Sequence, residues 1–202
     1  LPATGMQDDL FGAPSAPPAP PAAPSPSPDG APPPAQRRTG VHPVAWDAEL
    51  HALAARLPPP LRLGTSSWSY PGWQGLVWEG AHSEQTLAKK GLPVYAQHPL
   101  LRTVSIDRSF YRPLTVSDYL RYAAQVPPDF RFVVKAPSLV TDALVRSEDG
   151  RGREPNPAFL SPQLAVQEFV QPALEGLGPL TGALVFQLSP LPWPQLQRID
   201  AV

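Results

Sequence analysis

The sequence has 202 residues, with 16 Lys and Arg, 17 Asp and Glu, a net charge of −1 at pH 7 and no cysteine. This balance gives no electrostatic footprint for direct binding of nucleic acid or of an anionic membrane surface. The lack of cysteine excludes a disulfide framework, a thiolate nucleophile and a cysteine zinc site. No apolar run approaches the roughly 18–20 residues that span a bilayer. The composition fits a cytoplasmic bacterial protein with one domain and a tail.

The N-terminal segment, residues 1–43, is predicted to be a disordered tail and linker. It opens with Leu-Pro-Ala-Thr-Gly, which spells a sortase sorting signal. Such signals lie near a C-terminus, so we interpret the match as coincidental and Met6 as a candidate start. No basic region followed by an unbroken apolar core indicates a signal peptide. From Gly12 to Ala35 nearly every residue is Pro, Ala, Ser or Gly, which favours extended polyproline II over a packed core.

A short peptide precedes the proline-rich linker. Residues Gln7 to Phe11 read QDDLF, which is similar to the peptide by which bacterial proteins dock on the replicative sliding clamp. In such docking Leu10 and Phe11 would fill an apolar pocket and Gln7 would form a hydrogen bond at its rim, with the linker supplying reach. The similarity predicts an accessory protein of DNA replication or repair that is tethered to the clamp. Short motifs also arise by chance, and the alternative is a tail without a partner.

Order is predicted to begin near Val44, with an apolar stripe of helical spacing that Pro58 to Pro60 ends. Strand-like and helix-like segments then alternate, which predicts a parallel sheet with right-handed crossovers. Ser161 followed by Pro162 is typical of a helix N-terminus. The predicted strands are 61–65, 103–107, 130–136 and 183–188. The predicted helices are 46–57, 84–98 with an interruption at Gly91 and Pro93, 117–126, and one that begins after Ser161.

Two of these helices have predicted apolar sides. The helix over 117–126 is expected to place on one side Val116, Leu120 and Ala124. The last helix is expected to bury Leu164, Val166, Phe169, Val170 and Leu174.

Four segments in the expected order resemble the YecE-like family, known as domain of unknown function 72. They are GTSSWSYPGW at 64–73, VSIDRSFYRP at 104–113, FRFVVKAP at 130–137 and GALVFQLSP at 182–190. The resemblance implies an α/β fold, a TIM-type (β/α)8 barrel of which only about the first four β/α units are present. The family's own activity is not established, so the resemblance names no reaction.

A complete barrel has about 250 residues. Residues 44–202 are therefore predicted to be a truncated barrel domain with unpaired edge strands. In one interpretation the protein is the product of a truncated gene and an inactive fragment. The alternative is that four units from each of two chains associate as a dimer.

The working face of such a barrel lies at the carboxyl ends of its strands. Because side chains alternate along a strand, Val104 and Ile106 are predicted to face the helices. Asp107 and Lys135 are then predicted to point into the barrel, and they are the candidate catalytic residues. The candidate ligand-binding residues are Thr65, Ser66, Trp68, Tyr70, Tyr111, Arg112 and Gln187. Together these groups suit a small polar or phosphorylated ligand, and the sequence leaves open whether the protein is an enzyme.

Each candidate also has a structural interpretation. Asp107 with Lys135 or Arg108 can form an ion pair that closes the top of the barrel, Gln187 can cap a strand end, and the loop aromatics can pack against one another. Many family members have glutamate and asparagine where this chain has Ser105 and Asp107, so any role of that glutamate is open here.

No cofactor is named by the sequence. The histidines do not fall at predicted strand ends, and a histidine-rich metal site is not expected. They are His42, His51, His82 and His98. A glycine-rich phosphate loop, a nucleophile elbow and a helical HExxH motif do not occur in the sequence.

Overall fold

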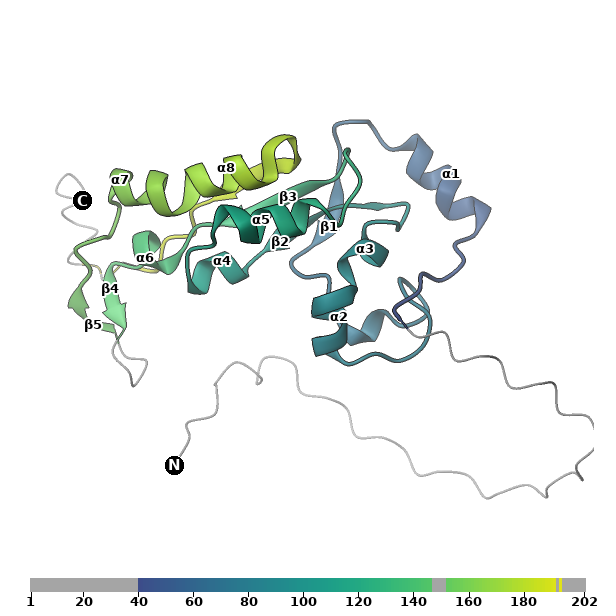
Figure 1. The fold of residues 1–202 in the computed structure, drawn as a ribbon, viewed down its shortest axis with the longest axis horizontal. Helices are drawn as coiled ribbons and strands as arrows, with labels where there is room; N and C mark the ends of the chain where they lie inside the picture. Colours follow the sequence, from purple (N-terminus) through teal and green to yellow (C-terminus); the bar gives the residue numbers. More distant parts are fainter. Residues whose placement is uncertain (1–39, 147–151, 192, 194–202) are drawn as a thin grey trace, which may run out of the picture. The chain divides into compact units, whose positions relative to one another are not determined.

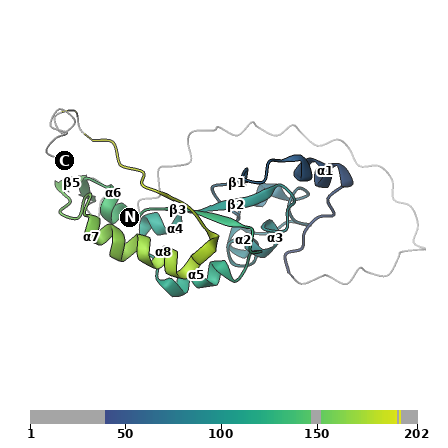
Figure 2. The same cartoon turned by 90° about the horizontal axis from the view of Figure 1, so that it is seen from above.

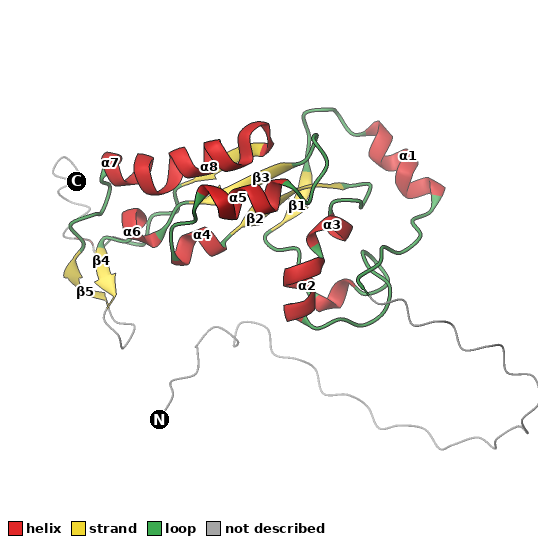
Figure 3. Cartoon of the chain, in the orientation of Figure 1, coloured by secondary structure: helices red, strands yellow, loops and turns green. Residues whose placement is uncertain are grey.

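The computed structural model describes residues 40–146, 152–191 and 193. These residues form a four-stranded sheet with helices and a separate two-stranded pair (Figures 1 and 3). The strands are β1 (Leu63–Thr65), β2 (Leu101–Ile106), β3 (Arg131–Lys135), β4 (Leu144–Arg146), β5 (Gly152–Pro155) and β6 (Thr181–Val185). The α-helices are α1 (Ala48–Arg56), α2 (Glu84–Lys90), α3 (Leu92–Tyr95), α4 (Arg108–Tyr111), α5 (Val116–Ala123), α6 (Ser138–Thr141), α7 (Pro162–Ala165) and α8 (Gln171–Leu177). Other turns are the 3-10 turns η1 (Pro71–Trp73) and η3 (Gly178–Leu180) and the π turn η2 (Val166–Val170).

The larger sheet has the strand order β1-β2-β3-β6, and every neighbouring pair in it is parallel. The predicted α/β class with parallel strands is therefore confirmed, and each predicted strand segment overlaps one of these strands. One face is covered, and on it α5 and α8 pack side by side (Figure 2). The buried side chains of the two central strands are Val104, Ile106, Phe132 and Val134. The partly exposed side chains of their opposite face are Thr103, Ser105, Val133 and Lys135.

The first two strands approach each other closely at Gly64. A Cβ atom at this position would lie 2.0 Å from the carbonyl oxygen of Thr103, so a glycine is required for the strands to pair. Tyr95 of α3 fixes the same place, because its hydroxyl lies 2.8 Å from the Oγ1 atom of Thr65 and donates to the carbonyl of Thr103 at 3.0 Å. The first residue of the segment 64–73 thus serves the packing of the sheet.

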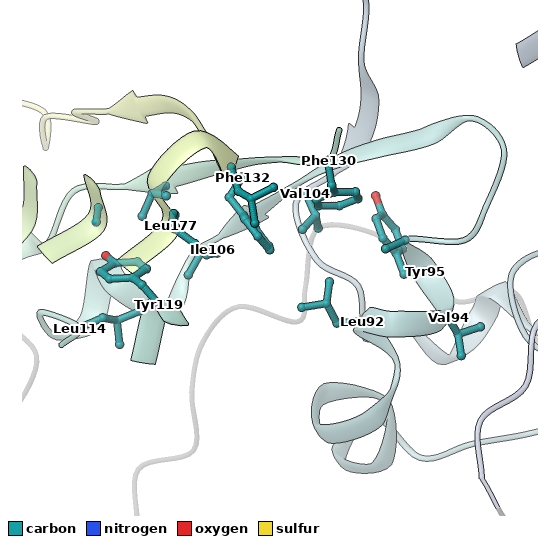
Figure 4. Close-up of a cluster of buried hydrophobic side chains, with 14 of the residues drawn as sticks. Leu92, Val94, Tyr95, Val104, Ile106, Leu114, Tyr119, Phe130, Phe132 and Leu177 are labelled. Carbon is teal, nitrogen blue, oxygen red and sulfur yellow. The ribbon is translucent and has the colours of Figure 1, made fainter. Parts of the chain in front are cut away.

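The hydrophobic core lies between the sheet and the helices of its covered face (Figure 4). The rings of Phe130 and Phe132 meet at 5.3 Å between centroids, and Tyr95 lies 6.3 Å from Phe130. Burial of one such side chain contributes roughly 1.5–3 kcal/mol. This core holds β2 and β3, the two strands that carry the candidate acid and base.

Helix α7, the π turn η2 and helix α8 run into one another. The hydroxyl of Ser161 accepts a hydrogen bond from the amide of Leu164 at 3.4 Å, so the predicted helix start is confirmed. In the π turn the amide of Gln171 donates to the carbonyl of Val166. The wider turn precedes Pro172, which has no N–H to donate and whose ring crowds the preceding turn of a regular helix.

The contact between α5 and α8 is made by Tyr119 and Gly176. Tyr119 is fully buried, and a Cβ atom at Gly176 would lie 2.4 Å from the Cβ atom of Tyr119. The apolar side predicted for α5 is therefore wrong as its packing face, since Leu120 is 52% exposed and Ala124 is exposed as well. The large ring opposite a glycine fills the space between the helices, and this turns Leu120 outward.

The buried face predicted for the last helix is right in part. Phe169 is buried, whereas Val166 is 50% and Leu174 is 49% exposed. A π turn changes the angle between residues on either side of it. Spacing that assumes a regular helix through η2 therefore assigns these two positions to the wrong face.

The predicted helix after Val44 is present as α1. Asp47 caps it, with its carboxylate accepting a hydrogen bond from the amide of Leu50 at 2.7 Å. None of the residues of α1 is buried, and Leu53 is 40% exposed. The helix therefore forms where the sequence places it, and the residues of its apolar stripe other than Leu53 are partly buried.

The antiparallel pair β4–β5 is an addition that the sequence does not predict. The peptide at residues 7–11 and the predicted tail up to residue 39 lie outside the described residues. Within the described part of the chain, no helix combines the length and the apolar character that crossing a membrane demands.

Candidate functional site

Asp107 and Lys135 meet at the carboxyl ends of two neighbouring parallel strands. The Nζ atom of Lys135 lies 3.8 Å from a carboxylate oxygen of Asp107. The hydroxyl of Ser105 donates to the other oxygen of that carboxylate, and Lys135 Nζ lies 5.7 Å from the centre of the Phe110 ring. The side chains of the pair are 26% exposed at Lys135 and 38% at Asp107. Both charged groups are thus oriented by neighbours and still open to solvent.

The ends of the same two strands are joined by a buried serine. The hydroxyl of Ser109 lies 2.7 Å from the carbonyl oxygen of Ile106 and 2.6 Å from that of Lys135. Ser109 is the second residue of the short helix α4, and its side chain is fully buried. It fixes the distance between the strand ends through main-chain atoms, whatever side chains the strands carry.

Helix α4 and the residue after it follow Asp107 directly in the chain and present exposed polar groups. Tyr111 is 76% exposed, with its ring edge-on to Phe110 at 5.5 Å. Arg108 and Arg112 are exposed on either side of it in the chain. Two exposed arginines thus follow Asp107 within five residues of the chain.

Thr65 has a structural part in the sheet. Its hydroxyl donates to the carbonyl of Ser67 at 2.7 Å, and its amide donates to the hydroxyl of Tyr95 at 3.1 Å. Burial raises the pKa of the Tyr95 phenol, and the hydrogen bonds with Thr65 oppose that rise. The neighbouring Ser66 is exposed. Thr65 therefore joins β1 to α3.

The loop aromatics after β1 divide between packing and exposure. The indole of Trp68 donates to the carbonyl of Ala88 at 3.3 Å, and its ring meets Tyr122 edge-on at 5.5 Å. It therefore links the loop to the helices. Tyr70 is 58% exposed and lies edge-on to Trp73 at 5.7 Å, so of the three aromatics in this loop it is the one most open to a ligand.

Gln187 lies beyond the end of β6, which finishes at Val185 rather than at the predicted 188. Its side chain is exposed. The structure thus brings Asp107 and Lys135 together and sets Ser105 beside them. It gives Thr65 and Trp68 packing partners elsewhere, and it leaves Gln187 in solvent.

Some residues at this edge were not among the sequence candidates. Ser109 and Phe110 hold the strand ends and the lysine, and Asp142 is a buried acid that accepts a hydrogen bond from the hydroxyl of Ser189. A serine on a short helix carries no signal in the sequence that its hydroxyl bridges two strands. In the described ranges, 40–146 and 152–191 with residue 193, no group of three or more His, Cys, Asp or Glu side chains could hold a metal ion.

Comparison with known proteins gives one family. The family model described as protein of unknown function DUF72 matches residues 62–202. A crystal structure of a DUF72 family protein from Enterococcus faecalis V583 at 3.10 Å resolution is 22% identical, with 69% of this chain and 46% of that chain covered and a TM-score of 0.41. A second structure of that description at 2.52 Å is 22% identical over 55% of this chain and 41% of that chain, with a TM-score of 0.34. The matches thus span less than half of each solved chain, and no curated protein matches the sequence.

Proposed function

Because the chain belongs to the DUF72 family, whose function is unknown, we propose a function from its own residues: the strand-end site around Asp107 and Lys135 binds a small polar, anionic ligand such as a phosphorylated molecule. The observation that carries this proposal is the partly exposed Lys135 ammonium, 3.8 Å from Asp107 at the carboxyl ends of β2 and β3. Ligands of open α/β sheets bind at that edge.

The charges favour an anion. Arg108 and Arg112 are exposed, one and five residues after Asp107 in the chain, and charge-assisted hydrogen bonds from arginine and lysine are the strong contacts to phosphate and carboxylate groups. The ring of Phe110 under Lys135 adds a cation–π contact that holds the ammonium in place. Lys135 then supplies the positive charge and Asp107 a hydrogen-bond acceptor or an acid–base group.

Titration of the protein with inorganic phosphate at constant ionic strength tests the site, and binding is monitored by the chemical shifts of backbone amides in NMR spectra. The proposal expects saturable shifts near β2 and β3. Lys135→Ala should weaken binding at least about tenfold, the loss expected for one charge-assisted hydrogen bond. Lys89→Ala, an exposed lysine in the last turn of α2, is the matched control and should bind like the parent. Equal weakening by both variants, or unsaturable shifts in the parent, contradicts the site.

The Asp107→Asn variant distinguishes two roles of the pair, a ligand site and a structural ion pair. Removing the negative charge beside Lys135 should strengthen phosphate binding or leave it unchanged, because the ammonium loses a competitor. Loss of phosphate binding together with loss of the folded state would instead assign the pair to stability.

We propose further that residues 44–202 are a (β/α)8-type barrel domain with its first four units, preceded by a tail and linker over residues 1–43. The support is the sheet of four parallel strands with its helices on one face. The main-chain carbonyl of His42 accepts a hydrogen bond from the amide of Glu79 at 2.8 Å, and Val41 packs against the core, so the last residues before position 44 already contribute to the fold. A chain of residues 40–202 should therefore unfold with the same free energy as the full chain, within about 0.5 kcal/mol. A larger difference in chemical denaturation would show that the segment 1–39 contributes to the fold as well.

A second function is proposed from the N-terminal peptide alone: Gln7, Leu10 and Phe11 dock the protein on the bacterial sliding clamp. Its support is the pattern QDDLF ahead of a proline-rich linker. A location in the bacterial cytoplasm, where the clamp acts, is part of this proposal. A peptide of residues 6–12 titrated into purified clamp should bind at micromolar concentration, whereas the peptide with Leu10→Ala and Phe11→Ala should not. Identical curves for the two peptides would remove this function.

A further inference from the structure

Helix α4 is anchored to the ends of both strands that carry the candidate pair. Its second residue, Ser109, is fully buried, and the Ser109 hydroxyl lies within hydrogen-bond distance of the carbonyl oxygens of Ile106 and Lys135. The helix also packs against β3 and α6 (Figure 1). The backbone of α4 therefore has a fixed position relative to the ends of β2 and β3.

Two aromatic rings of α4 follow one another from the lysine ammonium outward. The Nζ atom of Lys135 lies 5.7 Å from the centre of the Phe110 ring. The Tyr111 ring meets the Phe110 ring at 5.5 Å between centroids, with an angle of 84° between the two planes. The distance from the ammonium to the Tyr111 ring is thus at most the sum of these two distances. A positive charge and an aromatic ring therefore lie close together at one strand end.

The Tyr111 ring is open to a ligand. Tyr111 is 76% exposed, and no other large apolar side chain in the described part of the chain is exposed to so great an extent. Its backbone is already ordered by the buried Ser109 two residues earlier, so a ligand that stacks on the ring does not have to order a loop. Such a ring is suited to the flat face of a second ring.

Flat cationic groups adjoin Tyr111 in the chain. Arg108 precedes it by three residues and Arg112 follows it directly, and both are exposed. A guanidinium group binds phosphate oxygens in a bidentate manner and also stacks on flat rings. A bare anion would use only the charges of these side chains, whereas a ligand with a phosphate and a planar ring would use both their charges and their faces.

We propose that the strand-end site takes a nucleoside 5′-monophosphate, with the phosphate at Lys135 and the base stacked on Tyr111. This inference rests on the proposed binding of an anion at Asp107 and Lys135, and it adds the class of ligand. In a nucleoside monophosphate a ribose separates the phosphate from the base, so the molecule is long enough to reach from the ammonium to the Tyr111 ring. Every base has a π face that can stack on an aromatic side chain, so Tyr111 selects for a base without selecting which one.

Titrations of the full chain with adenosine 5′-monophosphate and with ribose 5-phosphate test the contact with the base, because only the first ligand carries adenine. At constant ionic strength, the nucleotide should bind at least about fivefold more tightly, the gain expected from one stacked base. Tyr111→Ala should lower the affinity for the nucleotide to that for ribose 5-phosphate and leave the affinity for inorganic phosphate unchanged. Tyr111→Phe keeps the ring and should keep the preference for the nucleotide.

Leu120→Ala is the matched control, since it also removes a large exposed apolar side chain. Leu120 is 52% exposed on α5, and this variant should bind the nucleotide like the parent. The NMR signals of the adenine protons give a second measurement that does not depend on affinity. Stacking on a tyrosine shifts these signals upfield through the ring current, and the shift should be lost in Tyr111→Ala and kept in Tyr111→Phe.

The outcomes distinguish this inference from the proposed phosphate site. Saturable binding of inorganic phosphate with equal affinities for the nucleotide and ribose 5-phosphate overturns the stacking of a base and leaves the phosphate site standing. A preference for the nucleotide that survives Tyr111→Ala overturns the role of Tyr111, and so does equal weakening of nucleotide and inorganic phosphate binding in that variant. Failure of both inorganic phosphate and the nucleotide to bind the parent overturns both proposals.

Discussion

The hydroxyl of Tyr95 lies 2.8 Å from the hydroxyl of Thr65, across the interface of α3 and β1. The same phenol accepts a hydrogen bond from the amide of Thr65 at 3.1 Å and donates to the carbonyl of Thr103 at 3.0 Å. One buried side chain therefore holds the two strands at the β1 edge of the sheet together.

Tyr95→Phe should lower the free energy of unfolding by about 1–3 kcal/mol, because it leaves buried partners without their hydrogen bonds. Tyr70 is 58% exposed, so Tyr70→Phe should change the free energy of unfolding by less than about 0.5 kcal/mol. Chemical denaturation of both variants checks this, and equal losses would show that the buried hydroxyl is not what joins the strands.

Gly176→Ala should destabilise the fold although alanine is the better helix former by about 1 kcal/mol. The new Cβ atom would lie 2.4 Å from Tyr119 Cβ and 2.7 Å from the carbonyl oxygen of Val116. Neither atom can move without shifting α5, so we expect a loss of about 1–3 kcal/mol. Glu175→Ala on the exposed side of α8 is the control, with little change expected in urea unfolding. A Gly176→Ala variant as stable as the parent would mean that the two helices separate freely.

Stability should fall as the pH drops below 6.5 through the titration of His98. Its ring lies edge-on to Trp46 at 5.2 Å, and its Nδ1 atom accepts a hydrogen bond from the amide of Leu100 at 3.2 Å. Burial lowers the pKa of His98 from its ordinary value of 6.5. The unfolded chain therefore binds a proton at a higher pH than the folded chain, so the stability present above 6.5 is lost as the pH falls towards the lowered pKa.

His98→Gln should flatten that slope between about pH 7.5 and pH 5. Unfolding free energies of parent and variant at several pH values in this range measure it. An unchanged slope in the variant would assign the pH dependence to other groups.

The ion pair of Asp107 and Lys135 should contribute little to stability. Both side chains are partly exposed, and such pairs contribute about 0–1 kcal/mol. A double-mutant cycle with Asp107→Asn and Lys135→Ala should therefore give a coupling energy below about 1 kcal/mol. A coupling above about 2 kcal/mol would favour a closing ion pair over a ligand site.

The sequence predicts much of the sheet and one contact of the candidate site. Alternation along the strands places Val104 and Ile106 under the helices and Asp107 and Lys135 together, because period two holds over short buried strands. The helix start at Ser161 is equally local, since a cap depends on two or three neighbouring residues.

The remaining features depend on tertiary contacts that no local pattern encodes. Leu120 turns outward because Tyr119 fits against Gly176 on another helix. The phase of the last helix changes at a π turn that comes just before Pro172. The bridge made by Ser109 requires the carbonyl of Lys135, 26 residues further along the chain, and spacing along the chain cannot reveal this contact.

Ser109 has a consequence for how this family can diversify. Its hydroxyl binds carbonyl oxygens at the ends of β2 and β3, atoms that every amino acid possesses. The separation of the two strand ends is therefore independent of which acid, amide or base stands at positions 107 and 135. Substitutions at these positions can change the chemistry of the edge while the backbone stays in place, so a new ligand can be acquired here without a new fold.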